Sequence, residues 1–250
     1  LKMNIIGVVN IQFVYTDDLF VIEVNPRASR TLPFLSKVTG INIAQVATQI
    51  CLGKKLAELG LTSKFAPLSS LVHIKAPVFS FAKLTDVDTA LGPEMKSTGE
   101  VMGSAPTYQK AIYKALKGSG YAMPESGSAL VTLSDSTKEE ALPLVKKLWQ
   151  MGFRIYATQG SQDFLQKHGI NVQRVNKIKE GSPHIVDLVR KTDIQIVINT
   201  MSKGKNVHSD GFKLRRACAE MGVISLTQID TAKALIDALE SYSFQVESLS

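Results

Sequence analysis

The sequence predicts two folds in series, an α+β part over residues 1–117 and a doubly wound parallel α/β sheet over residues 128–250. Three observations lead to this prediction. From residue 128 onward, short apolar strands alternate with helical segments, which is typical of βα units in a parallel sheet. Before residue 117, paired strands and helices follow one another without that alternation. Residues 118–127 (GSGYAMPESG) form the one Gly/Ser/Pro-rich stretch, which we interpret as a linker.

The composition is that of a globular protein long enough for two domains. Of 250 residues, 44% are apolar and 20% are charged, and no apolar run approaches the roughly 20 residues that span a bilayer. Without a secretory signal at its start, the protein is expected to be cytoplasmic and to have no membrane partner. Cys51 and Cys218 are far apart and in no C-x-x-C pair, which predicts ordinary thiols. The net charge is +7, but the Lys and Arg residues form no dense block, so anionic small molecules are expected as partners rather than nucleic acid.

The first elements are two β-rich runs, residues 5–15 and 19–25, which predict an antiparallel hairpin. A two-residue turn at Asp17 and Asp18 would place four polar residues on one face: Gln12 opposite Glu23, and Asn10 opposite Asn25. The other face would be apolar and half-buried, with Val9, Ile11, Phe13, Ile22 and Val24.

The rest of the first part is expected to be mainly helical. In order, we predict a helix at 34–52, a short helix at 54–60, a strand at 71–79, a short strand near the end of the loop-rich run 91–103 and a helix at 106–117. Gly53 and Gly60 supply helix stops.

In the second part, five strands and five helices alternate. Strands are predicted at 129–134, 153–158, 171–175, 194–200 and 223–227. Helices are predicted at 137–151, 161–168, 183–191, 211–221 and 228–242. Ligands of such sheets bind beyond the carboxyl ends of the strands. Those ends are Ser134, Thr158, Val175, Thr200 and Thr227.

Two sets of residues carry candidate chemistry. In the hairpin, the oxygen atoms of Gln12, Glu23 and Asn25 would suit Mg²⁺ or Mn²⁺ rather than zinc, shared with nucleotide phosphates. Arg27 and Arg30 offer planar forks for phosphate or bicarbonate oxygens. The alternative is a strand that simply ends at a turn proline.

At the sheet edge, Thr158–Ser161 links a strand end to a helix start, where free N–H groups and hydroxyls can hold a phosphate. Asn199, Thr200, Lys138 and Lys177 would add polar and positive groups at the same rim. The alternative is a set of ordinary loops.

These motifs carry a family resemblance. Residues 22–31 read IEVNPRASRT, preceded by NIQF and followed by SKVTG and GPEMKSTGEVMG. The whole chain resembles the carboxy-terminal end of the large subunit of carbamoyl-phosphate synthetases. Biotin-dependent carboxylases share the Glu-x-Asn-Pro core but continue it with Val-Glu-His, which is absent here.

The resemblance implies that residues 1–117 end the second ATP-grasp unit, which phosphorylates carbamate to carbamoyl phosphate for arginine or pyrimidine synthesis. ATP and Mg²⁺ or Mn²⁺ would be its cofactors, with bicarbonate, ammonia and a glutaminase small subunit as partners. Gln12, Glu23 and Asn25 match metal and nucleotide ligands, and Arg27 and Arg30 match phosphate-contacting arginines. The rest of the ATP-grasp machinery is expected upstream of Leu1.

Residues 128–250 resemble the methylglyoxal-synthase-like regulatory domain of the same subunit. By resemblance, five positions would hold a nucleotide monophosphate effector: Lys138, Thr158, Ser161, Lys177 and Asn199. Met201 departs from the hydroxyl usual at its position. His73 stands where ornithine-regulated members carry Glu, so ornithine control is not expected, although Thr227 matches one contact.

Two other functions fit the sequence less well. A methylglyoxal-synthase-type lyase would need a catalytic Asp, which residues 177–184 (KIKEGSPH) lack. A free-standing nucleotide sensor would leave Glu23, Asn25 and Arg27 without a role. The sequence therefore favours a part of an ATP-dependent ligase joined to a regulatory domain.

Overall fold

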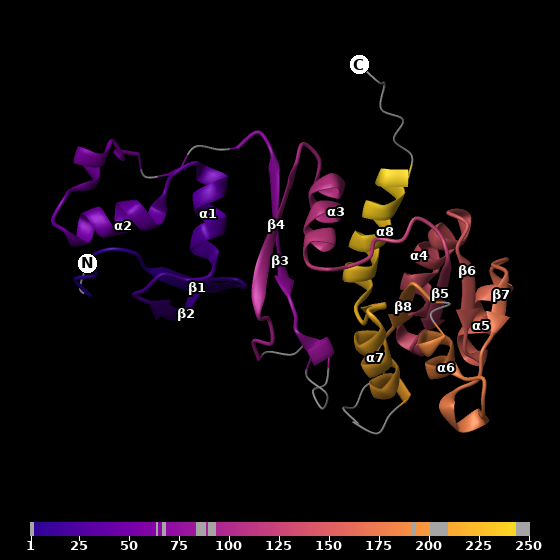
Figure 1. The fold of residues 1–250 in the computed structure, drawn as a ribbon. Coiled ribbons are helices and arrows are strands. Elements are labelled where there is room, and N and C mark those ends of the chain that lie inside the picture. Colours follow the sequence, from indigo (N-terminus) through magenta and orange to yellow (C-terminus); the bar gives the residue numbers. More distant parts are fainter. Residues whose placement is uncertain are drawn as a thin grey trace, which may run out of the picture. The chain divides into compact units, whose positions relative to one another are not determined.

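The structure, a computed structural model, describes residues 3–63, 65–66, 69–83, 89, 94–191, 194–200 and 210–243. It divides into two compact units, residues 1–73 and 74–250, which are described separately below (Figure 1). The first unit contains a hairpin and short helices, and the second contains a parallel sheet. Within the described residues, no helix has both the length and the apolar composition that crossing a membrane requires.

The first unit begins with a hairpin and continues with short helices. These elements are β1 (Asn10–Tyr15), β2 (Leu19–Asn25), α1 (Thr31–Thr39), α2 (Ile43–Cys51) and the 3₁₀ turn η1 (Leu56–Leu59). The prediction of a single helix at 34–52 is wrong, because the helix is interrupted between α1 and α2. Gly40 ends α1 in the left-handed conformation, with φ of 71°. Asn42 then caps α2, its side chain accepting a hydrogen bond from Gln45 N at 3.1 Å.

The turn of the hairpin is longer than predicted. Tyr15 pairs with Leu19, so three residues, 16–18, separate the strands. A β-bulge beside Phe13 compensates for the difference. Beyond the bulge the two strands follow the predicted register, so the end that carries the polar residues is paired as expected.

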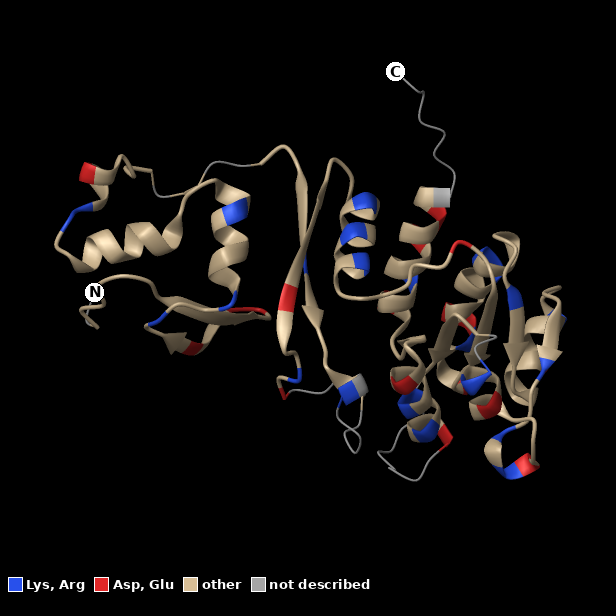
Figure 2. Cartoon of the chain, viewed as in Figure 1, with Lys and Arg blue, Asp and Glu red and all other residues tan. Residues whose placement is uncertain are grey.

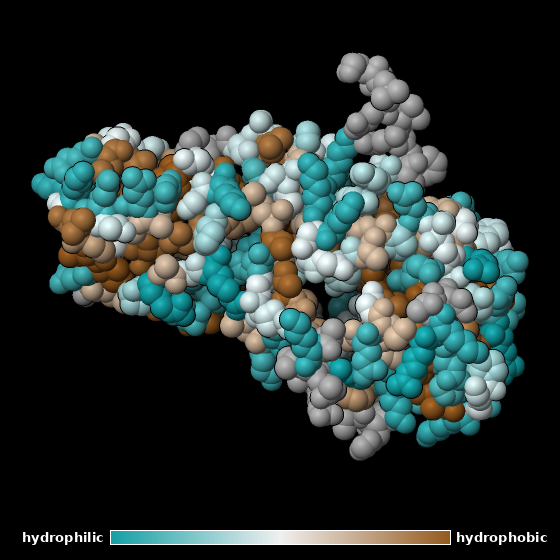
Figure 3. All heavy atoms as spheres, in the orientation of Figure 1, coloured by the Kyte–Doolittle hydropathy of each residue, from teal (hydrophilic) through white to brown (hydrophobic). Residues whose placement is uncertain are grey.

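Both faces of the hairpin are exposed, although the sequence predicts a half-buried apolar face. The exposed apolar side chains include Ile11, Phe13, Phe20, Val21 and Ile22. None of the described residues up to His73 is buried, and apolar residues reach the surface of this unit in Figure 3. A two-stranded sheet with short helices has too little apolar surface to enclose a core. The prediction of a half-buried apolar face is therefore wrong for this unit taken by itself, since Ile11, Phe13 and Ile22 are all exposed.

The second unit contains a five-stranded parallel sheet, which confirms the predicted doubly wound fold. Its strands lie in the order β7 (Val172–Arg174), β6 (Arg154–Ala157), β5 (Ser128–Thr132), β8 (Ile196–Asn199) and β9 (Ile224–Leu226). Its helices are α4 (Lys138–Gln150), α5 (Gln159–Lys167), α6 (Ile185–Arg190), α7 (Asp210–Met221) and α8 (Ile229–Ser243). The chain winds outward from central β5 in both directions, so the topological switch point lies between β5 and β8.

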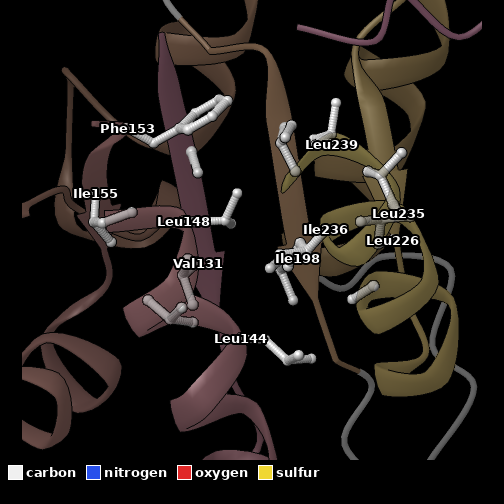
Figure 4. Close-up of a cluster of buried hydrophobic side chains, with 14 of the residues drawn as sticks. Val131, Leu144, Leu148, Phe153, Ile155, Ile198, Leu226, Leu235, Ile236 and Leu239 are labelled. Carbon is white, nitrogen blue, oxygen red and sulfur yellow. The ribbon is translucent and has the colours of Figure 1, made fainter. Parts of the chain in front are cut away.

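Apolar clusters hold helices on both faces of this sheet. The larger cluster joins α4, α5 and α8 to one face. Its members include Leu165 of α5 and, labelled in Figure 4, Val131, Leu144, Ile198 and Leu235. The smaller joins α6 and α7 to the other face through residues that include Leu130, Val189, Val197 and Leu214. Leu130 and Val131 are neighbours in β5 and belong to opposite clusters, because side chains alternate across a strand.

A smaller sheet and a helix precede the parallel sheet: β3 (Val72–Val78), which begins at the boundary of the units, β4 (Gly99–Ala105) and α3 (Tyr108–Gly118). Helix α3 packs against α8, where the rings of Tyr113 and Tyr242 stack with centroids 4.1 Å apart. The second compact unit thus begins well before residues 118–127. That stretch stays a prediction as the boundary between domains at 1–117 and 128–250.

Candidate functional site

The hairpin brings the three predicted metal ligands together. Gln12 lies opposite Glu23 in the strand register, and Asn25 lies two residues further along β2 on the same face. Asn25 Nδ2 donates a hydrogen bond to Glu23 Oε1 at 2.9 Å. This bond fixes the amide, so that its Oδ1 atom is directed away from the carboxylate and can accept another contact.

The donor atoms of this face fit a hard divalent cation. One carboxylate and two carboxamides offer oxygen ligands, which Mg²⁺ and Mn²⁺ prefer. The same set would be a poor zinc site, because it contains neither thiolate nor imidazole. Within the described residues, no group of three or more His, Cys, Asp or Glu side chains offers a competing site.

The two predicted arginines follow the strand but are not held alike. Arg27 Nη1 donates to the carbonyl oxygen of Ala28 at 3.1 Å, which engages one of the five N–H groups of an arginine. Arg30 is the residue at the start of α1, at its N-cap position. Asn10 Nδ2 lies 3.5 Å from Ser29 Oγ, so the segment between the arginines folds back over the polar face.

A cluster of hydroxyl groups occupies the switch point of the parallel sheet. Thr200 Oγ1 accepts a hydrogen bond from Ser134 N at 2.8 Å and lies 2.8 Å from Thr137 Oγ1. Asn199 Nδ2, at the end of β8, donates to Thr132 Oγ1, at the end of β5, at 2.5 Å. These bonds join the carboxyl ends of β5 and β8, the edge where ligands bind in doubly wound folds.

The next strand end adds the start of α5. Thr158 and Ser161 are buried there, and Ser161 Oγ accepts a hydrogen bond from Leu133 N at 2.9 Å. Because the hydroxyl oxygen serves the backbone, its proton remains able to donate. The start of α5 also carries the backbone N–H groups of Gln159 and Gly160, and a helix start favours an anion.

Lys138 reaches over the start of α5 from the first turn of α4. Its Nζ atom would lie 3.8 Å from a Cβ added to Gly160, and it pairs with Asp135 Oδ1 at 2.6 Å. The hydrogen bond from Lys138, followed by its charge, lowers the pKa of Asp135. Lys138 thus carries its positive charge to the helix start beside Thr158 and Ser161.

Lys177 lies farther along the same edge, on the exposed turn after β7. Its backbone N–H donates to Glu180 Oε2 at 3.0 Å. Among the described residues, no hydrogen bond or ion pair joins its ammonium group to the other four predicted effector ligands. Lys138 lies beside the helix start that carries Thr158 and Ser161, Asn199 ends β8, and Lys177 lies on the turn after β7.

A cavity of about 270 Å³ lies between α6 and α7. Its lining includes Ile178, Phe212, Lys213 and Arg216. None of the five predicted effector residues lines it, and α6 and α7 cover the face of the sheet opposite α4 and α5.

Three other residues were singled out in the sequence. Cys218 is buried against the sheet, and its desolvation raises the pKa of the thiol to about 12, so it stays protonated and unreactive. His73 Nε2 lies 2.8 Å from Ser69 Oγ, and its relation to ornithine control stays a prediction. Met201 lies outside the described residues.

Basic residues are spread over many elements of both units, as Figure 2 shows. The local groups at the strand ends, rather than one basic face, therefore define the candidate anion sites.

Two family models match the chain. The ATP-binding domain of the carbamoyl-phosphate synthase L chain matches residues 1–59, and the MGS-like domain matches residues 140–227. The first match contains Gln12, Glu23, Asn25, Arg27 and Arg30. The second contains Thr158, Ser161, Lys177 and Asn199, and Lys138 lies just before it.

Among solved structures, the chain is similar to methylglyoxal synthase from Elizabethkingia anophelis NUHP1. The two are 20% identical, and the similarity covers 45% of this chain and 78% of that chain with a TM-score of 0.39.

Proposed function

The chain matches a carboxy-terminal part of the carbamoyl-phosphate synthetase large subunit, and we propose on that premise that its hairpin serves ATP-dependent phosphorylation of carbamate. The observation that carries this proposal is the polar face of β1 and β2. Gln12 and Glu23 lie opposite each other there, with Asn25 bonded to Glu23. The hairpin is exposed, so its folding does not require one carboxylate and two carboxamides to share a face. A binding role explains why they do.

We assign distinct roles to the groups of this face. Gln12, Glu23 and Asn25 would hold Mg²⁺ or Mn²⁺ together with ATP, and a bound metal would neutralise charge on the nucleotide phosphates. Arg27 and Arg30 would hold the oxygens of the carbamate and of the transferred phosphoryl group in line through their planar forks. Positioning and charge stabilisation are the main contributions that proteins make to phosphoryl transfer.

Substitution Glu23→Gln tests the site in a complete large chain that contains this segment. The reverse partial reaction, ATP formation from carbamoyl phosphate and ADP, isolates the carbamate-phosphorylating site. We expect its rate to fall by about 10²-fold or more, because the only carboxylate of the set loses its charge. Folding should be preserved, because Glu23 lies on an exposed strand.

Asp17→Asn is the matched control, because it removes a carboxylate from the turn of the same hairpin. This variant should form ATP at the normal rate. If Glu23→Gln formed ATP as fast as Asp17→Asn, the metal-site assignment would be wrong.

For the second unit we propose a regulatory role in which a nucleotide monophosphate binds at the carboxyl edge of the parallel sheet. Support comes from Lys138 and the buried hydroxyls of Thr158 and Ser161 around the start of α5. Asn199 contributes from the switch point, and Lys177 from the turn after β7.

Calorimetric titration of the chain with uridine and inosine monophosphates tests this role. Lys138→Met should weaken binding by about tenfold to a hundredfold, because a charged hydrogen bond to phosphate contributes roughly 1.5–3 kcal/mol. Lys146→Met removes an exposed lysine from the same helix and should leave binding unchanged. Equal affinities in the two variants would refute the assignment of Lys138.

The remaining expectations are proposals of the same kind. We propose ammonia from a glutaminase small subunit and bicarbonate as the sources of carbamate, in arginine or pyrimidine synthesis, and a cytoplasmic location. A lyase of the methylglyoxal-synthase type is the second candidate. It is less well supported, because residues 177–184 contain no Asp to serve as its base.

A further inference from the structure

Arg215 is a buried cation directly behind the switch point. It lies on the inner side of α7 and is only 6% exposed. Its Nη1 atom lies 3.4 Å from Asn199 Oδ1, at the end of β8. Since a guanidinium can only donate hydrogen bonds, Arg215 determines which end of the Asn199 amide faces it.

The orientation of this amide extends to the opposite strand. With Oδ1 turned toward Arg215, Nδ2 of Asn199 is directed at Thr132 Oγ1, to which it donates at 2.5 Å. Arg215, Asn199 and Thr132 thus form one chain of hydrogen bonds from α7 to the end of β8 and on to its neighbour β5. The neighbouring residue, Thr200, carries the hydroxyl that accepts from Ser134 N.

Gly211 provides the space for this arrangement. A Cβ added there would lie 3.2 Å from Arg215 Nη1 and 3.3 Å from Asn199 Oδ1. Every other residue type would therefore press on both partners of the hydrogen bond.

The charge of Arg215 is permanent and poorly screened. A guanidinium does not lose its proton in proteins, and ions in water screen buried charges much less than exposed ones. Its field therefore acts on the edge of the sheet where Asn199 and Thr200 meet Ser134. An anion bound at this edge would gain from that field without touching the arginine.

We propose that Arg215 is a positioning residue for the phosphate of the effector: it orients Asn199 and supplies a fixed positive potential at the switch point. This inference rests on the regulatory function proposed above. It adds to the ligand set a residue of α7 that does not itself need to contact the ligand.

The test compares Arg215→Met, Arg215→Lys and Arg216→Met in the full chain. Arg216 is the matched control, because it is the adjacent arginine of α7 but bonds to Glu220 and to the Phe81 carbonyl instead. Binding of uridine and inosine monophosphates is measured by calorimetry, and the thermal midpoint reports folding. We expect Arg215→Met to bind about tenfold more weakly, Arg215→Lys to recover part of the loss and Arg216→Met to bind normally.

The possible results separate this inference from the proposed function. Absence of binding by the unmodified chain would overturn both. Binding by the unmodified chain and equally tight binding by folded Arg215→Met would overturn the role of Arg215 alone. If Arg215→Met does not fold, Gly211→Ala decides, since its Cβ displaces the same pair: weaker binding by the folded variant supports the inference, and unchanged binding overturns it.

Discussion

Ser161 shows how one side chain at the candidate effector site can serve both the fold and the ligand. Its hydroxyl oxygen accepts the backbone N–H of Leu133 at 2.9 Å, and the residue is 2% exposed. Ser161→Ala would leave that N–H without its partner in a place that water reaches poorly. We expect the free energy of unfolding to fall by about 1–3 kcal/mol, measured by urea denaturation.

Ser136→Ala is the comparison for Ser161→Ala, because Ser136 is an exposed hydroxyl at the same sheet edge. It should change the free energy of unfolding by less than about 0.5 kcal/mol. Equal stabilities of the two variants would mean that the Ser161–Leu133 bond contributes nothing to the fold.

Among single residues, the shared face of Glu23 and Asn25 could be predicted from the sequence, whereas the role of Arg215 could not. Side-chain alternation along β2 was sufficient to predict that Glu23 and Asn25 share a face. The role of Arg215 had no comparable signal. Its importance depends on burial and on its distance to Asn199, and neither follows from the position of an arginine within a helical segment.

At the scale of elements, β4 and α3 approach so closely that the packing depends on a missing side chain. A Cβ added to Gly103 would overlap the carbonyl oxygen of Ala111 and lie 2.5 Å from Ala115 N. Both atoms belong to the backbone of α3 and cannot turn aside. Gly103→Ala should therefore lower the free energy of unfolding by about 1–3 kcal/mol or more, measured by thermal denaturation.

Gly118→Ala is the comparison, because Gly118 lies in α3, the helix that contacts Gly103. Its added Cβ would meet the side chain of Val101 at 3.7 Å, an ordinary contact. Stability should be unchanged or rise by up to about 1 kcal/mol, because alanine favours helix more than glycine does. Loss of stability by Gly118→Ala equal to that of Gly103→Ala would contradict the close approach of β4 and α3.

Elements were predicted best where each strand and helix repeats a local pattern. The five strands and five helices of the parallel sheet follow from apolar runs separated by glycine and polar residues. The helix at 34–52 was wrong because its apolar periodicity continues across Gly40 and Asn42, which are the stop and start signals of two helices. The hairpin turn was wrong because a β-bulge leaves no clear signal in the sequence.

At the scale of the whole molecule, the expected linker and the observed units differ in place. Composition alone draws attention to residues 118–127, whereas packing joins α3 to α8 through buried Tyr113 and its partner Tyr242. Local composition carries no information about which helix will cover a given face of α8. For the same reason, the exposed apolar residues of the hairpin could not be foreseen from their alternation.

This difference leads to a prediction about fragments. A fragment of residues 70–250 retains β3, β4 and α3, whereas a fragment of residues 124–250 begins within the stretch 118–127 that the sequence predicts as the linker. The shorter one loses Ile112, Tyr113, Leu116, Tyr121 and Met123 from the larger apolar cluster. We expect both to fold, with the free energy of unfolding of the shorter fragment lower by at least about 3 kcal/mol in urea, because burying large apolar side chains stabilises by that order.

A third fragment, residues 106–250, determines which element is responsible. It keeps α3 but lacks β3 and β4, so it should be more stable than residues 124–250 if the packing of α3 on α8 supplies the difference. If residues 70–250 and 124–250 unfolded at the same urea concentration, α3 would contribute nothing, and the stretch 118–127 would mark the boundary of the stable domain after all. If only the longest fragment were stable, the support would come from the sheet of β3 and β4, which packs on α3 through the close contact at Gly103.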